Sequence, residues 1–310
     1  MTLVGNLMIL AAVFTATEAQ SPDIPAWQTA AGGKMAFDVA SVKLSTSFRP
    51  PLFPLDNRNA YVPGGRLSAT FPLEVYITFA YKLSLTDEQR RLAFGHLPKW
   101  AGTGLFEIEA RAEGKPTKDQ LRLMMQSLLA DRFKLAVHFE TREGPVFELT
   151  LAKPGKRGPK LRPHAEGPPC PDSLTPVGTP PGAGDIFPRD CETAAMSERK
   201  GVRMIGSRNT TMPLLADAIS SYGAMAGEVD KPVVDKTGLL GTFDFTVEYM
   251  PGGNDTFVRP GLPNADAPPP NPQGTPFLTA MREQLGLKLV TSKGPIRMLV
   301  IDHIESLSEN

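Results

Sequence analysis

Proline is distributed unevenly along this chain, and its positions mark where regular secondary structure is excluded. Because proline lacks a backbone N–H and has a fixed φ, helix interiors and central strands reject it. Eighteen of the 31 prolines fall in two windows, ten in residues 154–188 and eight in residues 251–276. We therefore predict that these windows are a linker and an insertion, with packed structure on either side of them.

The two stretches that remain, about 65–153 and 202–305, form an internal repeat. The run TFPL at 70–73 aligns with TMPL at 211–214. In each run we expect the Thr to cap a helix that carries Pro in its first turn. Apolar residues then recur at helical spacing in both stretches, which predicts one buried stripe on each helix.

A strand and a second helix are predicted next in both stretches. Residues 106–110 and 243–248 alternate between apolar and polar, as a half-buried strand does. In the first stretch, Thr117 and Gln120 have the spacing of a capping box at the start of the second helix. In the second stretch, Gly286 is expected to end the corresponding helix.

Each stretch closes with a sequence that favours a hairpin. Gly144-Pro145 and Gly294-Pro295 interrupt alternating runs, and this dipeptide is typical of a turn. The pattern of each module is therefore βαβαββ. The predicted fold class is α+β, with two related modules built on antiparallel sheets and separated by Pro/Gly-rich inserts.

The predicted domain organisation follows from these patterns. The first module spans 35–153 and includes an additional strand at 37–43. A Pro/Gly-rich linker spans 154–200. The second module spans 201–308 and contains the Pro-rich insert 251–276.

The first 19 residues have the pattern of an export signal. An apolar run, LMILAAVF at 7–14, precedes small and polar residues that place Thr17 and Ala19 at positions −3 and −1 of a cleavage site. The run is too short to cross a bilayer. We predict cleavage near Ala19 and a secreted or periplasmic mature protein with no transmembrane span. A buried N-terminal strand or helix is the alternative.

The only two cysteines, Cys170 and Cys191, both lie in the linker. In an oxidising compartment we expect them to form a disulfide, which would stabilise a loop of about twenty residues by roughly 3 kcal/mol. Two cysteines alone do not make a zinc site, and the nearest histidine, His164, has no partner at ligand spacing. The sequence therefore predicts no metal site.

The charges exclude nucleic acid as the main partner. Lys plus Arg and Asp plus Glu number 33 each, so no surplus of positive charge is available to neutralise phosphates. The local exception is a cluster of five cations where the first module meets the linker. We interpret it as a solvated face, with attraction to an anionic polymer such as cell-wall or capsule material as the alternative: Lys153, Lys156, Arg157, Lys160 and Arg162.

The sequence offers no set of catalytic residues and no cofactor motif. The run DKTG at 235–238 matches the start of the phosphorylation loop of P-type ATPases, but Leu239 stands where that loop needs Thr. We predict a tight turn instead, in which Asp235 binds backbone amides and Gly238 adopts a positive φ. No serine lies in a G-x-S-x-G frame. Each of the four histidines is interpreted as a strand, loop or linker residue rather than a general base: His96, His138, His164 and His303.

Three ordered motifs carry a family resemblance: FDVASVK at 37–43, LLADRFKL at 128–135 and PVVDKTGLLGTFDF at 232–245. The chain resembles an uncharacterised, soil-associated family expanded in Acidobacteria and built on a domain of unknown function. Related domains also occur fused to membrane metallopeptidases of the antibiotic-sensor type. The resemblance implies an extracytoplasmic sensing or binding module, and it supplies no catalytic residues.

We therefore expect a secreted, non-enzymatic binding or sensing module for a peptide, protein or envelope ligand. Strand addition at an exposed sheet edge, or insertion between the modules, would bind such a ligand. One alternative is an extracytoplasmic hydrolase with a site between the modules, using His138 or His303 with an acidic partner. Another is a structural partner of an envelope complex.

Overall fold

The computed structural model describes residues 25–61, 64–171, 174–175, 182, 184–252 and 274–307. The fold is α+β, as predicted. The expected export signal and most of the insert 251–276 lie outside the described residues. The elements in chain order are α1 (Ala26–Ala30), β1 (Val39–Ser45), β2 (Arg66–Pro72), α2 (Leu73–Ala80), α3 (Asp87–Phe94), α4 (Lys99–Thr103), β3 (Leu105–Arg111), α5 (Lys118–Phe133), β4 (Ala136–Leu151), β5 (Leu161–Pro163), η1 (His164–Glu166), β6 (Ala195–Arg199), β7 (Val202–Thr211), α6 (Met212–Met225), β8 (Val233–Asp235), β9 (Thr242–Tyr249), α7 (Phe277–Leu285) and β10 (Leu287–His303).

The first module packs α2 and α5 on an antiparallel sheet of order β1-β3-β2. Helix α5 begins with the predicted capping box: the Thr117 hydroxyl accepts the Gln120 N–H, and the Gln120 side chain accepts the Thr117 N–H. Its apolar stripe is buried against the sheet. Leu299 and Ile301, from the far end of the chain, complete this core.

The second module packs α6 and α7 on an antiparallel sheet of order β5-β9-β7-β6. Helix α7 ends where Gly286 adopts φ 68°, as predicted. Both ends of the expected linker, β5 and β6, pair in this sheet. Leu149 of β4 is fully buried in this second core, although it precedes the linker in sequence.

The order β1-β3-β2 in the first sheet matches β5-β9-β7 in the second, so both copies of the repeat build the same unit. The predicted alignment of Thr70 with Thr211 is wrong by two residues, because Pro72 pairs with Leu105 as Thr211 pairs with Thr242. Pro72, not Thr70, is the N-cap of α2, and Thr211 caps α6 without a side-chain hydrogen bond.

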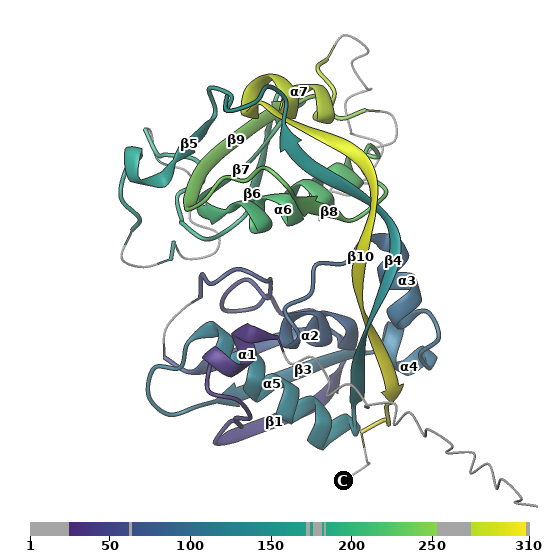
Figure 1. Ribbon diagram of the computed structural model, residues 1–310. Coiled ribbons are helices and arrows are strands. Elements are labelled where there is room, and N and C mark those ends of the chain that lie inside the picture. The colour runs from purple at the N-terminus through teal and green to yellow at the C-terminus, as the bar shows by residue number, and fades with distance from the viewer. Residues whose placement is uncertain are drawn as a thin grey trace, which may run out of the picture.

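The two predicted hairpins are wrong. Strands β4 and β10 run through their Gly-Pro dipeptides without turning, and they pair with each other along their length as an antiparallel ribbon. Figure 1 shows this ribbon along one side of the molecule, joining the two modules. The short strand β8 pairs in parallel with β4 only from Phe147 to Leu149, so beside Pro145 and Pro295 the ribbon has two strands with open edges. There, a proline whose missing N–H faces outward costs no ladder bond.

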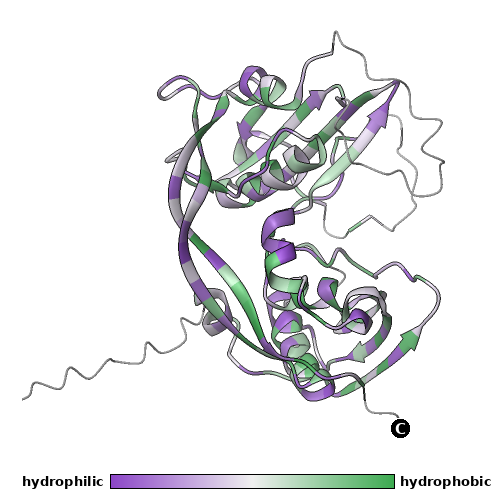
Figure 2. Cartoon of the chain, turned by 90° about the vertical axis from the view of Figure 1, so that its right-hand side faces the viewer, coloured by the Kyte–Doolittle hydropathy of each residue, from purple (hydrophilic) through white to green (hydrophobic). Residues whose placement is uncertain are grey.

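The ends of the ribbon belong to different cores. Figure 2 shows it becoming strongly apolar in its lower half, toward the first module, where Leu299 joins the first core. At the other end, Leu149 and Leu287 are buried in the second core. Each repeat therefore sends its last strand from its own module into the other.

A polar contact also joins the modules away from the ribbon. The Asn57 amide donates to Asp217 of α6 over 2.6 Å, and Arg58 reaches the Leu214 carbonyl. Burial raises the pKa of Asp217 to about 6, although Arg58 and Asn57 oppose that shift. The buried Arg122 of α5 fixes the loop that carries Asn57, because it donates to the carbonyls of Asp56 and Arg58.

Candidate functional site

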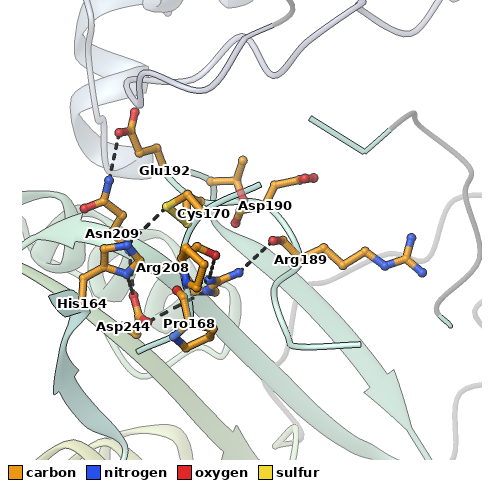
Figure 3. Close-up of a disulfide and its surroundings, with 12 residues drawn as sticks. His164, Pro168, Cys170, Arg189, Asp190, Glu192, Arg208, Asn209 and Asp244 are labelled. Carbon is orange, nitrogen blue, oxygen red and sulfur yellow. Dashed lines mark hydrogen bonds and ion pairs between the residues drawn. A yellow bond between two sulfur atoms is a disulfide. The ribbon is translucent and has the colours of Figure 1, made fainter. Parts of the chain in front are cut away.

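The Cys170–Cys191 disulfide lies within a cluster of polar side chains on the second module (Figure 3). It joins the segment after η1 to the segment before β6, over a sequence separation of 21, with the two Cα atoms 5.6 Å apart. The expected pairing is thus present. We call the disulfide, His164, Arg208 and Asp244 the cystine cluster.

His164 lies between a carboxylate and a sulfur. Its Nδ1 is 2.7 Å from Asp244 Oδ1, and its Nε2 is 3.3 Å from Cys170 Sγ. The side chains of His164 and Asp244 are each 17% exposed. Since a carboxylate accepts a hydrogen bond, Nδ1 carries the proton of the neutral ring, and the Nε2 lone pair faces the sulfur. The sequence gives His164 no partner at ligand spacing, and the fold places Asp244 and Cys170 on either side of its ring.

A bulge in β7 fixes the position of Asp244. The register of β7 and β9 shifts between Ser207 and Thr210. Within the bulge, Asn209 adopts φ 52°, and its N–H donates to Asp244 Oδ1 over 2.9 Å. The Asn209 amide in turn donates to Glu192, which also has a positive φ. Bulges and left-handed non-glycine residues persist where the surroundings over-determine them, and they concentrate at functional sites.

Arg208 ties both sides of the disulfide loop to β7. Its guanidinium donates to the carbonyls of Pro168 and Pro169 on one side and of Arg189 on the other. Its Nε lies 4.0 Å from Asp244 Oδ2. Because Arg208 is only 4% exposed and its terminal nitrogens bind backbone, it acts as an internal clamp rather than as a ligand-binding cation.

A second candidate site lies at the N-terminal end of the linker. A turn at 152–160 packs against the end of α7 and forms a groove of about 740 Å³. We call it the α7 groove. The residues that line it are Ala152, Lys153, Lys156, Arg157, Gly158, Pro159, Leu278, Thr279, Met281, Arg282, Glu283, Gly286, Lys288 and Leu289.

Local sequence explains how the wall of the α7 groove forms. Lys153-Pro154-Gly155-Lys156 makes a tight turn closed by a 3.1 Å hydrogen bond, with Gly155 at φ 67°. Pro and Gly in these central positions favour a type II turn. The chain then passes against α7 so closely that a Cβ on Gly158 would lie 2.3 Å from the Gln284 carbonyl oxygen. Gly158 N–H donates to Leu285 O, which also satisfies the end of the helix.

The α7 groove concentrates positive charge from three elements. Two of its cations come from the turn, one from α7 and one from β10, and none of these four makes an ion pair with any residue that the structure describes: Lys153, Lys156, Arg282 and Lys288. Arg157 adds a fifth cation and packs over the Phe243 ring. The floor is apolar: Leu278 and Leu289 are partly exposed there, and Met281 belongs to the buried core of the module.

The histidines named for a hydrolase lie elsewhere. His138 and His303 are on the ribbon, with side chains 42% and 55% exposed. The carboxylates of Asp302 and Glu140, which accept hydrogen bonds from the His138 ring, raise its pKa. Neither ring lines the α7 groove or the pocket of about 320 Å³ beside the cystine cluster. The fold does not bring these two histidines into a shared pocket with the cystine cluster.

The DKTG motif forms the turn that the sequence predicts. Asp235 ends β8, and its carboxylate accepts the Thr237 N–H and hydroxyl over 2.9 and 2.7 Å. Gly238 has φ 70°. The carboxylate is therefore engaged with its own turn.

Sequence reasoning missed Asp244 and Arg208. Asp244 occupies a polar position of an alternating strand, and 80 residues separate it from His164, so no local pattern joins them. A histidine six residues before a linker cysteine was the one available signal.

Comparison with known proteins adds a family. No curated protein and no solved structure matches the chain. Among the described residues, no helix combines the length and apolar character needed to cross a membrane. A family model covers residues 74–304, which reach from α2 to just beyond β10 and include both candidate sites. The chain therefore belongs to the family described as protein of unknown function (DUF3738).

Proposed function

We propose that this chain is an exported, non-enzymatic binding module and that its α7 groove takes an acidic peptide segment. The observation that carries the proposal is the convergence, over an apolar floor in the α7 groove, of cations that have no ion-pair partner among the described residues. The export pattern of residues 1–19 and the disulfide support an extracytoplasmic location, because disulfides persist in oxidising compartments.

Charge complementarity gives the ligand its chemistry. The whole chain has a formal net charge of zero. The α7 groove is lined by five cations and one carboxylate, that of Glu283, so its net charge is about +4 and its local field attracts an anion. A polyanion that has no apolar groups would use the cationic rim alone. A peptide with both acidic and apolar side chains would also bury surface against the partly exposed Leu278 and Leu289, which favours the peptide over an envelope polysaccharide.

The cations also have a structural role that the test must separate from binding. Lys153, Lys156 and Arg282 lie near the C-terminal end of α7, where positive charge stabilises a helix by a few tenths of a kcal/mol. A charge reversal there lowers stability slightly, whether or not a ligand binds. Binding must therefore be measured directly, on variants shown to be folded.

The test is the fluorescence anisotropy of a labelled peptide of Glu-Glu-Leu repeats. We expect saturable binding that weakens with salt, and a loss of at least about tenfold in Arg282→Glu and in Lys288→Glu. Lys99→Glu, an exposed lysine on α4, changes the net charge equally and should bind like the wild type. Absence of binding, or equal loss in Lys99→Glu, would overturn the proposal. Equally tight binding of polyglutamate would replace the peptide with a simple polyanion.

A further inference from the structure

The cystine cluster holds a set of metal-donor atoms around its disulfide. The donor atoms of His164, Cys170 and Cys191 all lie within 4.8 Å of one another. Each of them is partly or fully buried. We propose that reduction of the Cys170–Cys191 disulfide turns this cluster into a zinc site, with two thiolates and His164 Nε2 as ligands. The proposal is independent of the α7 groove.

The chemistry balances with a dithiol as the reductant. The dithiol supplies two electrons and two protons, breaks the S–S bond and leaves as its own disulfide, so that Cys170 and Cys191 become thiols. Zn²⁺ then displaces one proton from each thiol and binds the two thiolates, while the neutral imidazole donates its Nε2 lone pair. No proton leaves His164, because its remaining proton lies on Nδ1.

The partner of His164 is of a kind that zinc histidines have. Histidine ligands generally donate their second ring N–H to a carboxylate, a backbone carbonyl or water, which fixes the tautomer and the ring plane. Asp244 does this at 2.7 Å, and the Asn209 N–H holds the same carboxylate oxygen in place. The imidazole is thus oriented toward the sulfur before any metal arrives.

The donors stay together once the S–S bond opens, because other contacts hold both segments. Arg208 donates to carbonyls on both sides of the loop, and none of these bonds involves sulfur. Asn209 also holds Glu192, the residue after Cys191. The site therefore does not depend on the disulfide for its assembly.

The donor set selects the kind of metal. Two thiolates and one imidazole suit Zn²⁺, whereas Mg²⁺ and Ca²⁺ take oxygen ligands. Three protein ligands leave the fourth tetrahedral position to water, as in zinc sites that are not purely structural. A disulfide packed beside an unrelated histidine would bind no metal on reduction, so the two interpretations differ in a measurable way.

The experiment compares zinc binding by the oxidised and the reduced protein. The full chain is reduced with dithiothreitol, desalted without oxygen and titrated with Zn²⁺, and Co²⁺ serves as a spectroscopic probe of tetrahedral thiolate ligation. We expect one Zn²⁺ per chain in the reduced protein and at least about 100-fold weaker binding in the oxidised protein. Asp244→Asn should weaken binding 10- to 100-fold, and His164→Ala at least as much. His138→Ala, a ribbon histidine with carboxylate neighbours, should bind like the wild type.

Two outcomes would overturn the proposal. One is zinc binding by the Cys170→Ser/Cys191→Ser double variant as tight as that of the reduced wild type. The other is a reduced wild type that binds no zinc, or that binds it equally tightly after His164→Ala. The oxidised His164→Ala protein keeps the disulfide, so its circular dichroism reports separately whether the variant folds.

Discussion

Gly144 of β4 lies directly opposite Gly294 of β10 in the antiparallel register of the ribbon. These glycines come from the Gly-Pro dipeptides of the two repeats, so the repeats meet each other at equivalent positions. Pro145 faces Lys293, and Pro295 faces Glu143, on either side of this pair. The ribbon is therefore close to symmetric about the two glycines, and each repeat completes the core of the other.

Exchange of the last strands predicts where a core substitution acts. Leu149 belongs in sequence to the first repeat, yet it is fully buried in the second core. Leu149→Ala should lower the free energy of unfolding by about 2–5 kcal/mol, the usual cost of such a cavity. Hydrogen exchange should show the loss of protection in β9 and α6. Urea unfolding measures the free energy.

The control for Leu149→Ala is on the same ribbon. Val290 of β10 pairs with Glu148 and is 41% exposed, so Val290→Ala should cost well under 1 kcal/mol. An equal cost in both variants, or protection lost only in the first module, would contradict strand exchange.

Local signals predicted the elements well, because each rests on neighbouring residues. Thr117 and Gln120 form their capping box within one turn, and Gly286 ends α7 at its own φ. The strand with which a strand pairs is not determined by its neighbouring residues. Gly144-Pro145 has the local character of a turn, and only pairing with a strand about 150 residues later keeps β4 extended. No local pattern contains that information.

The contact between the modules predicts a pH dependence. The Asp217 carboxyl has a pKa of about 6 in the folded protein, against 3.8 for its ordinary value. As pH rises through this window, the unfolded chain releases the proton first, so stability falls between about pH 4 and pH 6. The total is of order 3 kcal/mol at 1.36 kcal/mol per pKa unit. Urea unfolding across this pH range measures the slope.

Asp217→Asn places a neutral amide of nearly the same shape next to Asn57 and Arg58, and this side chain does not ionise between pH 4 and pH 6. We expect this variant to be at least as stable as the wild type at pH 7 and to lack the fall in stability between pH 4 and pH 6. Identical slopes for the two proteins would show that another group causes the pH dependence.

The candidate sites were less predictable than the fold. The five cations where the first module meets the linker were visible in sequence, but only the structure adds Arg282 and Lys288 to Lys153 and Lys156 and places all four over an apolar floor. The cystine cluster needs β7, β9 and both ends of the linker together. A bulge that turns Asn209 toward Asp244 leaves no signature in alternating polarity.

Loss of the disulfide should act mainly on the second module. The Cys170→Ser/Cys191→Ser variant releases a loop of 21 residues, which on the chain-entropy model lowers the free energy of unfolding by about 3 kcal/mol. Reduced wild type without metal should lose the same amount. Limited proteolysis should cut the loop between these two positions before the first module. Equal susceptibility of both modules would contradict this prediction.

The wall of the α7 groove depends on a close backbone approach at Gly158. A Cβ there would lie 2.3 Å from Gln284 O and 2.5 Å from Gly286 N, both backbone atoms that cannot rotate away. Gly158→Ala should therefore shift the turn, destabilise the protein by about 2 kcal/mol or more and weaken the acidic peptide. Gly155→Ala is the matched control, since at φ 67° with open space around it the cost is the left-handed strain of about 1–2 kcal/mol. Urea unfolding and peptide anisotropy are measured on both variants. If Gly158→Ala binds the peptide as tightly as Gly155→Ala does, the turn at 152–160 does not shape the binding surface.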